Sequence, residues 1–413
     1  MIPGEVLQSH EQFSEHVLLI RDTSVVESAA FESDPDHNTL NSPWSFSGVL
    51  QAGFRQRKED VQRFIDDWSN SLTGIPAGKV FRDEWRRHDE TFSIDRAPVR
   101  LLAVVNRLDL ARVEDGTCNQ PPGQPCLCGA EIRFVFGAII PKNLTVSPDG
   151  YFSMIVEFVL PCQSQAAFQV LVRSWRSLNV PGWPEKYHTD LGERLREATG
   201  AAELVRLRTI MSTFNNSWNV QQYKFTPQGL VRKPLDREFK PAFYCLGPES
   251  DIGTFAKQRP EEILAGRYDV DDKLGTSVTT VTVGAHPVLT LARNLQPGDN
   301  TDKVRFSLSI NSCTGCHSGE TETSFHHVAM RKRNERSRLS CFLTGSTTSE
   351  PSATQFCSVN APEHECNSQP TVRDFNDLLR RHLFLDAVDH LDVNAPAAEW
   401  KKALDGVNAV QTH

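Results

Sequence analysis

A short cysteine motif constrains this chain more than any other feature. Residues 313–317 read Cys-Thr-Gly-Cys-His. This spacing attaches c-type haem: two thiols add to the porphyrin vinyl groups and the adjacent histidine binds the iron. Cys313 and Cys316 would then hold the haem, and His317 would be its first axial ligand. Half of a zinc site, a redox dithiol, disulfide cysteines or a chance match fit the same five residues, so these alternatives stay open.

A second iron ligand is expected downstream of the motif, where His326, His327 and Met330 follow. In one continuous helix, His317 and His327 would lie about 15 Å apart along the axis, so they can share an iron only if the chain loops back. Imidazole binds ferric iron more firmly than a thioether does. We therefore predict a histidine, His326 or His327, ahead of Met330 as the second ligand. An open iron position is the alternative, and an enzyme would need it.

Other residues flank the motif. Gly315 and Gly319 allow the chain to fold back around a flat cofactor. Glu320 and Glu322 are weak candidates for catalytic proton donors, and whether the protein is an enzyme stays open. The basic segment Arg331–Arg338 would neutralise haem propionates, dock an acidic partner or form a solvated loop.

Composition narrows the class of protein. The chain has 413 residues, 39% of them hydrophobic and 23% charged, which predicts a globular protein with a real core. A net charge of −8 argues against nucleic-acid binding, since phosphates require a basic face. No apolar run approaches the roughly eighteen residues of a membrane-spanning helix. The first residues lack a secretory signal, but haem attachment is normally completed outside the cytoplasm, so we expect a removed leader and a periplasmic or secreted protein.

Eight further cysteines favour export. They are Cys118, Cys126, Cys128, Cys162, Cys245, Cys341, Cys357 and Cys366. Most lie in loops rich in Pro, Gly and Ser, where disulfides commonly stabilise exported proteins. The local candidates for pairing are Cys357 with Cys366, and Cys118 with either Cys126 or Cys128. Buried thiols of a cytosolic protein are the alternative.

Hydrophobic periodicity predicts an α+β fold. We expect helices over 40–98 and 168–220 and strands over 99–160 and 220–290. The segment 17–26 also has strand character. Residues 1–298 would form a main domain with its helical N-terminal part on a mixed or antiparallel sheet. Residues 299–413 would form a C-terminal loop-and-helix region, cytochrome-c-like or metal-binding, that carries the motif.

Apolar spacing also predicts core residues. Those in the N-terminal helices are Trp44, Phe46, Phe64 and Trp68, and those in a C-terminal helix are Leu378, Leu379, Leu383, Leu385 and Val388. Five charged residues sit on or beside the predicted strands. Burying charge is costly unless it is paired, so Arg107 and Arg133 either pair with Asp109, Glu131 and Glu157 in a structural network or line a polar pocket.

The motif region, KVRFSLSINSCTGCHSGETETSFHHV, is followed by RLSCFLTG and RDFNDLLRR. It resembles a family of exported, largely uncharacterised bacterial proteins, frequent in myxobacteria, with a pattern close to FSLNTCNGCHxxETxTxFxHI, then LSxFLTG and FNDLxRR. Upstream, PWSFSGVLQ, FIDDW, APVRLLAVVNRLDL and AEIRFVFG are similar to further segments of that family. The resemblance implies an exported protein with a c-haem-like motif and no assigned substrate. The matching positions are Cys313, Cys316, His317, Glu320, Thr321, Phe325 and His327, while Cys341 stands where glycine is usual. The family resemblance favours His327 over His326 as the second ligand.

The sequence as a whole predicts an exported c-type cytochrome-like protein. It would carry haem c and move electrons to or from a redox partner protein, or perform haem redox chemistry. No Walker loop, dinucleotide-binding glycine motif, serine-hydrolase elbow or HExxH zinc motif is present. The alternative is a non-enzymatic interaction protein stapled by disulfides or by zinc, with Cys313, Cys316 and one or two of His317, His326 and His327 as ligands.

Overall fold

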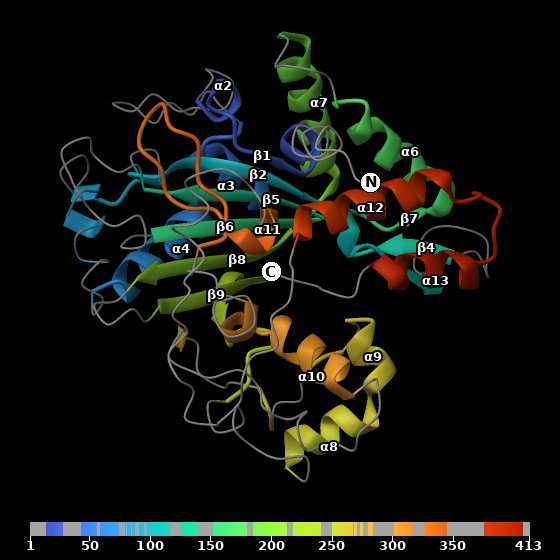
Figure 1. The fold of residues 1–413 in the computed structure, drawn as a ribbon. Coiled ribbons are helices and arrows are strands. Elements are labelled where there is room, and N and C mark those ends of the chain that lie inside the picture. Colours follow the sequence, from blue (N-terminus) through green and yellow to red (C-terminus); the bar gives the residue numbers. More distant parts are fainter. Residues whose placement is uncertain are drawn as a thin grey trace.

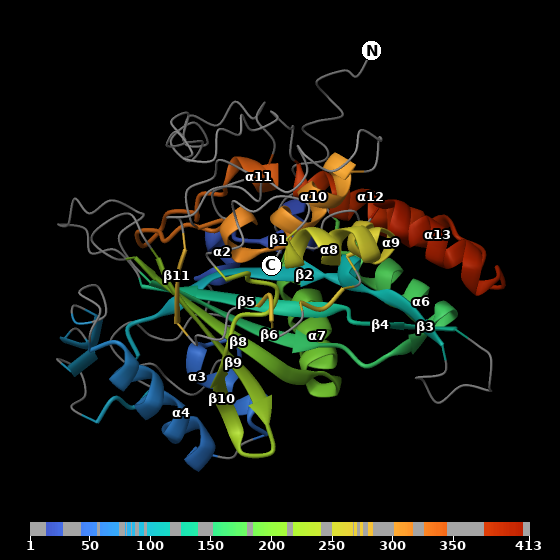
Figure 2. The ribbon, with the colours of Figure 1, turned by 90° about the horizontal axis from the view of Figure 1, so that it is seen from below.

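One large antiparallel sheet organises the fold (Figures 1 and 2). The structure, a computed structural model, describes residues 14–27, 43–55, 58–73, 79, 81–83, 85–86, 91–94, 97–115, 125–138, 152–179, 185–212, 218–240, 250–266, 268–270, 273–275, 280–283, 301–316, 326–344 and 376–407. The predicted α+β class is confirmed. Among these residues no helix is long and apolar enough to cross a bilayer.

The large sheet is antiparallel throughout its described pairs. Its order is β1 (Leu19–Ile20), β2 (Arg100–Arg107), β5 (Glu131–Gly137), β6 (Phe152–Val159), β8 (Glu203–Ser212), β9 (Trp218–Thr226) and β10 (Gly229–Lys233), with β11 (Thr280–Val283) also paired to β9. A small second sheet joins β3 (Arg112–Asp115), β4 (Pro125–Cys128) and β7 (Gln163–Ser164). Successive side chains of a strand point to opposite faces, so each strand of the large sheet contributes to two different surfaces.

One face of the large sheet is aromatic. Helices α3 (Phe46–Gly53), α4 (Lys58–Ser71) and α7 (Glu185–Ala201) lie on this side, below the sheet in Figure 2. Ring contacts between helices and strands, with centroids 5.1–5.8 Å apart, join Trp44 to Phe134, Phe46 to Phe136, Phe64 to Tyr223 and Trp68 to Phe152. The four aromatic residues predicted for the N-terminal core are thus confirmed as buried.

The opposite face of the same sheet is charged. Glu157 on β6 is fully buried and lies 2.5 Å from Arg206 Nε and 3.2 Å from Arg208 Nη1, both on β8. Arg133 on β5 pairs with Glu131 of the same strand at 2.6 Å. In Figure 2, helices α10 (Thr301–Ile310), α11 (Cys341–Thr344) and α12 (Asp377–His390) lie over this face. The segment that contains the cysteine motif therefore packs on the charged side of the sheet.

The remaining helical elements are short or peripheral. They are the π-helix Ser14–Leu18, α2 (Thr23–Val26), the 3-10 turn Leu108–Leu110, α6 (Gln165–Arg176), α8 (Asp251–Gln258), α9 (Pro260–Leu264) and α13 (Ala397–Val407). One hydrophobic cluster contains sheet residues together with Ile310, Phe342, Phe384 and Trp400, so the C-terminal segments share the core of the sheet. The domain boundary predicted between residues 298 and 299 lies outside the described residues.

Three predictions of local structure are wrong. The predicted helix does not extend through 203–212, which is β8: Arg206 and Arg208 lie opposite Glu157 and Ile155 of β6 on one face, and Leu207 lies opposite Val156 on the other, a period of two rather than 3.6. A register shift before Arg206 places Leu204 opposite Phe158, on the same face as Leu207, so these two leucines keep a three-residue spacing. Of the expected strand over 17–26, only Leu19–Ile20 forms β1. Helix α2 follows directly, because the Asp22 carboxylate accepts a hydrogen bond from Ser24 N and caps it.

The third error concerns α12. Leu383 is 50% exposed, although Leu378, Leu385 and Val388 are buried as predicted. Asp377 and Arg381 take inward positions on this helix. Its buried face is therefore partly charged, and spacing of apolar residues alone could not define it.

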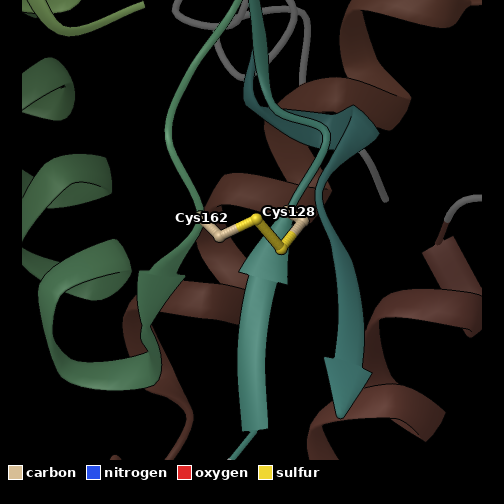
Figure 3. Close-up of a disulfide and its surroundings, with 2 residues drawn as sticks. All are labelled: Cys128 and Cys162. Carbon is tan, nitrogen blue, oxygen red and sulfur yellow. A yellow bond between two sulfur atoms is a disulfide. The ribbon is translucent and has the colours of Figure 1, made fainter. Parts of the chain in front are cut away.

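A disulfide fixes the base of the β5–β6 pair (Figure 3). Cys128 lies just before β5 and Cys162 just after β6, and the antiparallel pairing of the two strands brings these ends together with Cα atoms 4.3 Å apart. The suggested pairing of Cys118 with Cys128 is therefore wrong, because the partner of Cys128 is 34 residues away. Cys126 is also disulfide-bonded. Cys118, Cys245, Cys357 and Cys366 lie outside the described residues, and with them the predicted pair of Cys357 and Cys366.

Candidate functional site

The two motif cysteines lie on a single helical turn. Ser312 begins the turn: its Oγ accepts a hydrogen bond from Gly315 N at 3.0 Å, and its carbonyl oxygen accepts one from Cys316 N at 2.9 Å. This is the pattern of a serine N-cap. Cys313 and Cys316 are consequently one turn apart, and both are buried. The other predicted positions of the motif, His317, Gly319, Glu320, Thr321, Glu322 and Phe325, lie outside the described residues.

A distant carboxylate anchors this turn. Glu238, which follows β10 in the chain, accepts hydrogen bonds from Thr314 N at 3.1 Å and from Thr314 Oγ1 at 2.6 Å. Both residues are almost fully buried. Sequence analysis missed Glu238, because it is 76 residues from Thr314 and belongs to no motif. The position of the cysteines is thus set by the sheet as well as by local chain geometry.

Gly315 is required by close backbone contact. A Cβ atom at this position would lie 1.9 Å from the carbonyl oxygen of Ser309. We expect Gly315→Ala to lower the free energy of unfolding by about 1–3 kcal/mol or more, as overpacking does. Gly200→Ala is the matched control, because nothing lies within 4 Å of a Cβ there and alanine favours a helix. Denaturant unfolding measures both, and equal stability of the two variants would contradict the tight turn.

Cys313 and Cys316 are thiols rather than disulfide-bonded. Cys313 packs in a cluster with Ile210, Val220 and Leu235. Burial, together with the nearby carboxylate of Glu238, raises the pKa of the Cys313 thiol well above its usual value. Cys313 therefore stays protonated at neutral pH, and the structure favours the alternatives that use thiols over a disulfide at the motif.

The second cysteine contacts the predicted iron ligand. His327 Nε2 lies 3.2 Å from Cys316 Sγ, and His327 Nδ1 lies 2.7 Å from Ser340 Oγ. A hairpin-like segment holds this arrangement, since Ser340 N donates to the carbonyl oxygen of His327 at 3.0 Å. The segment thus brings His327 back to the motif. A chain that loops back is what the sequence requires if His317 and His327 are to bind one iron. Ser340 is a further residue that sequence analysis missed.

A cavity lies between the charged face of the sheet and the motif region. Its volume is about 60 Å³, room for a few water molecules or a small organic group, and it is partly open to solvent. Its walls are Leu19, Val105, Arg107, Arg133, Val135, Ser153, Ile155, Ile210, His326, His327, Val328, Phe342, Leu343 and Arg381. Both histidines predicted as possible ligands therefore lie on one cavity, and His326 Nδ1 is 3.2 Å from Ser153 Oγ. Met330, the weaker candidate, packs beside Gly137 and is not on this wall.

The cavity also borders the cysteine turn. Ile210 packs with Cys313, Ile155 packs against the same cluster, and both line the cavity. His327, the contact of Cys316, lines it as well. Both motif sulfurs are therefore adjacent to residues of one wall.

The charged residues of the sheet satisfy both interpretations of the sequence. Arg107 pairs with Asp109 at 2.9 Å, and Arg133 pairs with Glu131, so the predicted structural network exists. Arg107 and Arg133 also line the cavity, so the polar pocket exists too. Burial lowers the pKa of arginine but the carboxylates Glu131 and Glu157 outweigh it at Arg133, whose pKa is raised. This guanidinium is firmly charged.

The basic segment Arg331–Arg338 lies elsewhere. Arg331 is buried, pairs with Glu27 and donates to the carbonyl oxygen of Leu101 at 3.2 Å. Arg21 Nη1 donates to the carbonyl oxygen of Ser337 at 2.6 Å. No residue of this fully described segment lines the cavity. Its contacts fix the hairpin to the N-terminal part of the chain, and they do not support a role toward haem propionates.

Metal-ligand side chains do not cluster within the described part of the chain. No group of three or more His, Cys, Asp and Glu residues meets there in a way that could hold a metal ion. Cys313, Cys316, His326 and His327 are all among the residues searched. A metal bound at the motif would thus need a further ligand from outside the described ranges, such as His317.

No protein-family model, curated protein or solved structure matches the chain, so its own site is the basis for a functional proposal.

Proposed function

We propose that this is an exported c-type cytochrome-like protein that carries one haem attached to Cys313 and Cys316, next to the cavity, and exchanges electrons with a redox partner protein. The observation that carries the proposal is the position of the two thiols. They are not in a disulfide, they lie one helical turn apart, and their neighbours Ile210 and His327 form part of the cavity wall. The disulfides of Cys128 and Cys126 support export, because disulfides persist in oxidising compartments.

The chemistry of the wall residues fits haem, whereas the cavity of about 60 Å³ is far smaller than the macrocycle and neither Cys313 nor Cys316 is on its wall. Eight of the wall residues are aliphatic or aromatic, which suits a flat apolar macrocycle, and arginines on the same wall suit its two carboxylates. Attachment requires each thiol to add across a vinyl group: an S–C bond forms, the sulfur's proton goes to the neighbouring carbon, and no electron is gained or lost overall. Cys313 and Cys316 are both thiols and not part of a disulfide, which is the form that this addition needs. When bound, haem supplies one-electron redox chemistry at its iron.

His327 is the residue that we propose would hold the haem iron together with His317. Its Nδ1 is held by Ser340 Oγ, and such a hydrogen bond fixes ring orientation and tautomer in metal-binding histidines. Its Nε2 is thereby directed toward the sulfur of Cys316. His326 is also on the wall and its Nδ1 is likewise engaged, with Ser153 of β6; His327 is preferred because it contacts a motif cysteine.

His327→Ala should shift the absorption spectrum of the haem protein from six-coordinate low-spin toward high-spin, because the iron loses a strong-field ligand. His390→Ala, at an exposed site near the end of α12, is the control and should leave the spectrum unchanged. A wild-type protein that is already high-spin, or a His327→Ala spectrum equal to that of wild type, would rule out His327 as a ligand.

Attachment itself is tested by haem staining. Protein made in a host with haem-attachment machinery should keep its haem through denaturing electrophoresis, because thioether bonds survive unfolding. Loss of all stain on denaturation would contradict covalent attachment. Recovery of the native protein from the periplasm or medium tests export in the same preparation.

A structural zinc site is the second candidate function. The observation that favours it is the 3.2 Å separation of Cys316 Sγ and His327 Nε2, two atoms of the kinds that zinc prefers. With Cys313 and His317 they would make a four-ligand set. Colourless protein with one zinc per chain after export would select this candidate over haem.

A further inference from the structure

Arg381 on α12 is a buried cation, and two of its three guanidinium nitrogens have no hydrogen-bond partner among the described residues. It is 2% exposed and lines the cavity. Its Nη2 lies 2.5 Å from an oxygen of Asp377, one turn earlier in the helix. Its Nε and Nη1 are buried and have no hydrogen-bond partner among the described residues. Such groups are normally satisfied in proteins, so unpartnered donors on a cavity wall indicate a missing acceptor.

The charge balance around Arg381 also favours an anion. A chain of side-chain ion pairs runs from Arg107 through Asp109, Arg380 and Asp377 to Arg381. Asp377, the carboxylate that Arg381 contacts, is shared with Arg380, so it does not neutralise Arg381 alone. Burial first, and Arg107 next, lower the pKa of Arg381 to about 10, which still leaves it charged at neutral pH. One buried guanidinium with a shared carboxylate and two unpartnered nitrogens matches a monovalent acid group better than a dianionic phosphate.

The other walls of the cavity indicate the chemical character of the rest of the ligand. Leu19, Val105, Phe342 and Leu343 line the same cavity as Arg381. Apolar walls with few polar groups bind apolar bodies, and the polar groups fix their orientation. The ligand should therefore combine an apolar body with one acid group.

We propose that the cavity binds a carboxylate on an apolar body, with Arg381 as the residue that recognises the carboxylate. Guanidinium and carboxylate form strong charge-assisted hydrogen bonds. Such bonds are stronger at a buried site than in water, because the local dielectric constant is lower. Two sources offer this chemistry: a free organic acid, and a carboxylate of a porphyrin that is attached at the motif and reaches the cavity. The inference stands on Arg381 and the cavity, whether or not haem is attached.

The first test uses the wild-type full chain made without haem-attachment machinery. Isothermal titration with 3-phenylpropionate should show saturable binding, and its neutral amide should bind about tenfold or more weakly, as expected for loss of one charged hydrogen-bond partner. Arg381→Gln should weaken acid binding by about the same factor, while Arg381→Lys retains part of it. Arg173→Gln is the matched control. Arg173 on α6 also pairs with an aspartate of α12, Asp389, but its side chain is exposed.

Equal binding of acid and amide, or equal acid binding by wild type and Arg381→Gln, would overturn the proposal. If Arg381→Gln fails to fold, the comparison of acid with amide and the Arg381→Lys variant still decide it. Repeating the titration on haem-loaded protein separates the two sources. Binding only to the haem-free form identifies the haem carboxylates as the resident partners of Arg381, and binding to both forms identifies a separate acid. Binding to neither form overturns the site. Absence of covalent haem, seen by mass, would refute the proposed function without affecting the titration.

Discussion

Replacing Glu157 with glutamine should lower the free energy of unfolding by about 3–5 kcal/mol, the usual cost of breaking a buried ion pair by removing one partner. Glu157 is fully buried and is the shared partner of Arg206 and Arg208. Without its charge, Arg208, itself buried, loses a carboxylate partner at 3.2 Å. Glu203→Gln is the matched control, because Glu203 begins the adjacent strand β8 but pairs with Arg55 where both side chains are 73% exposed. Exposed pairs contribute about 0–1 kcal/mol.

The same substitution has a predictable pH dependence. Burial alone would raise the pKa of Glu157, but the guanidinium groups of Arg206, Arg208 and Arg133 outweigh it and lower the pKa to about 2 from a model-compound value of 4.5. A depressed folded-state pKa gives stability that is present above the unfolded-state pKa and lost as pH falls through the folded-state pKa. The stability gap between wild type and Glu157→Gln should be constant above pH 5 and narrow between pH 4.5 and 2. A gap that does not change with pH would contradict this ionisation.

The sequence was informative where a pattern is local. Apolar spacing identified Trp44, Phe46, Phe64 and Trp68 as core, and the cost of buried charge identified the pairing of Arg107 and Arg133 with nearby carboxylates. The α+β class followed from alternating stretches of two periodicities. These features depend on residues within a few positions of one another, so a single sequence is enough to predict them.

The cavity and its supports were not predictable in this way. Glu238 reaches Thr314, Ser340 reaches His327, and Arg381 lines the same cavity as residues of the sheet, only because of strand register and helix packing. A one-residue shift of register in β5 would exchange Arg133 for Phe134 on the charged face, and nothing in a single sequence reports that register. Strand β8 was misassigned because its apolar residues also fit a helical spacing.

The second large effect concerns the motif thiols. Cys313→Ser and Cys316→Ser together should abolish covalent haem entirely, because a hydroxyl does not form the thioether. Each single variant should retain at most one bond to the haem. Both sites are buried, so each variant is checked by circular dichroism and thermal unfolding before its haem content is compared. A folded double variant that still carries covalent haem would show that attachment occurs elsewhere, for example at another cysteine.

Intact mass spectrometry of the denatured wild-type protein is the most direct test of haem attachment at Cys313 and Cys316. The protein should be made in a host with haem-attachment machinery, exported, and extracted with acid before measurement. The predicted result is the mass of the mature chain plus one haem in the wild type, and the mass of the chain alone in the double serine variant. A wild-type chain without added haem, colourless and still folded, would contradict the proposal.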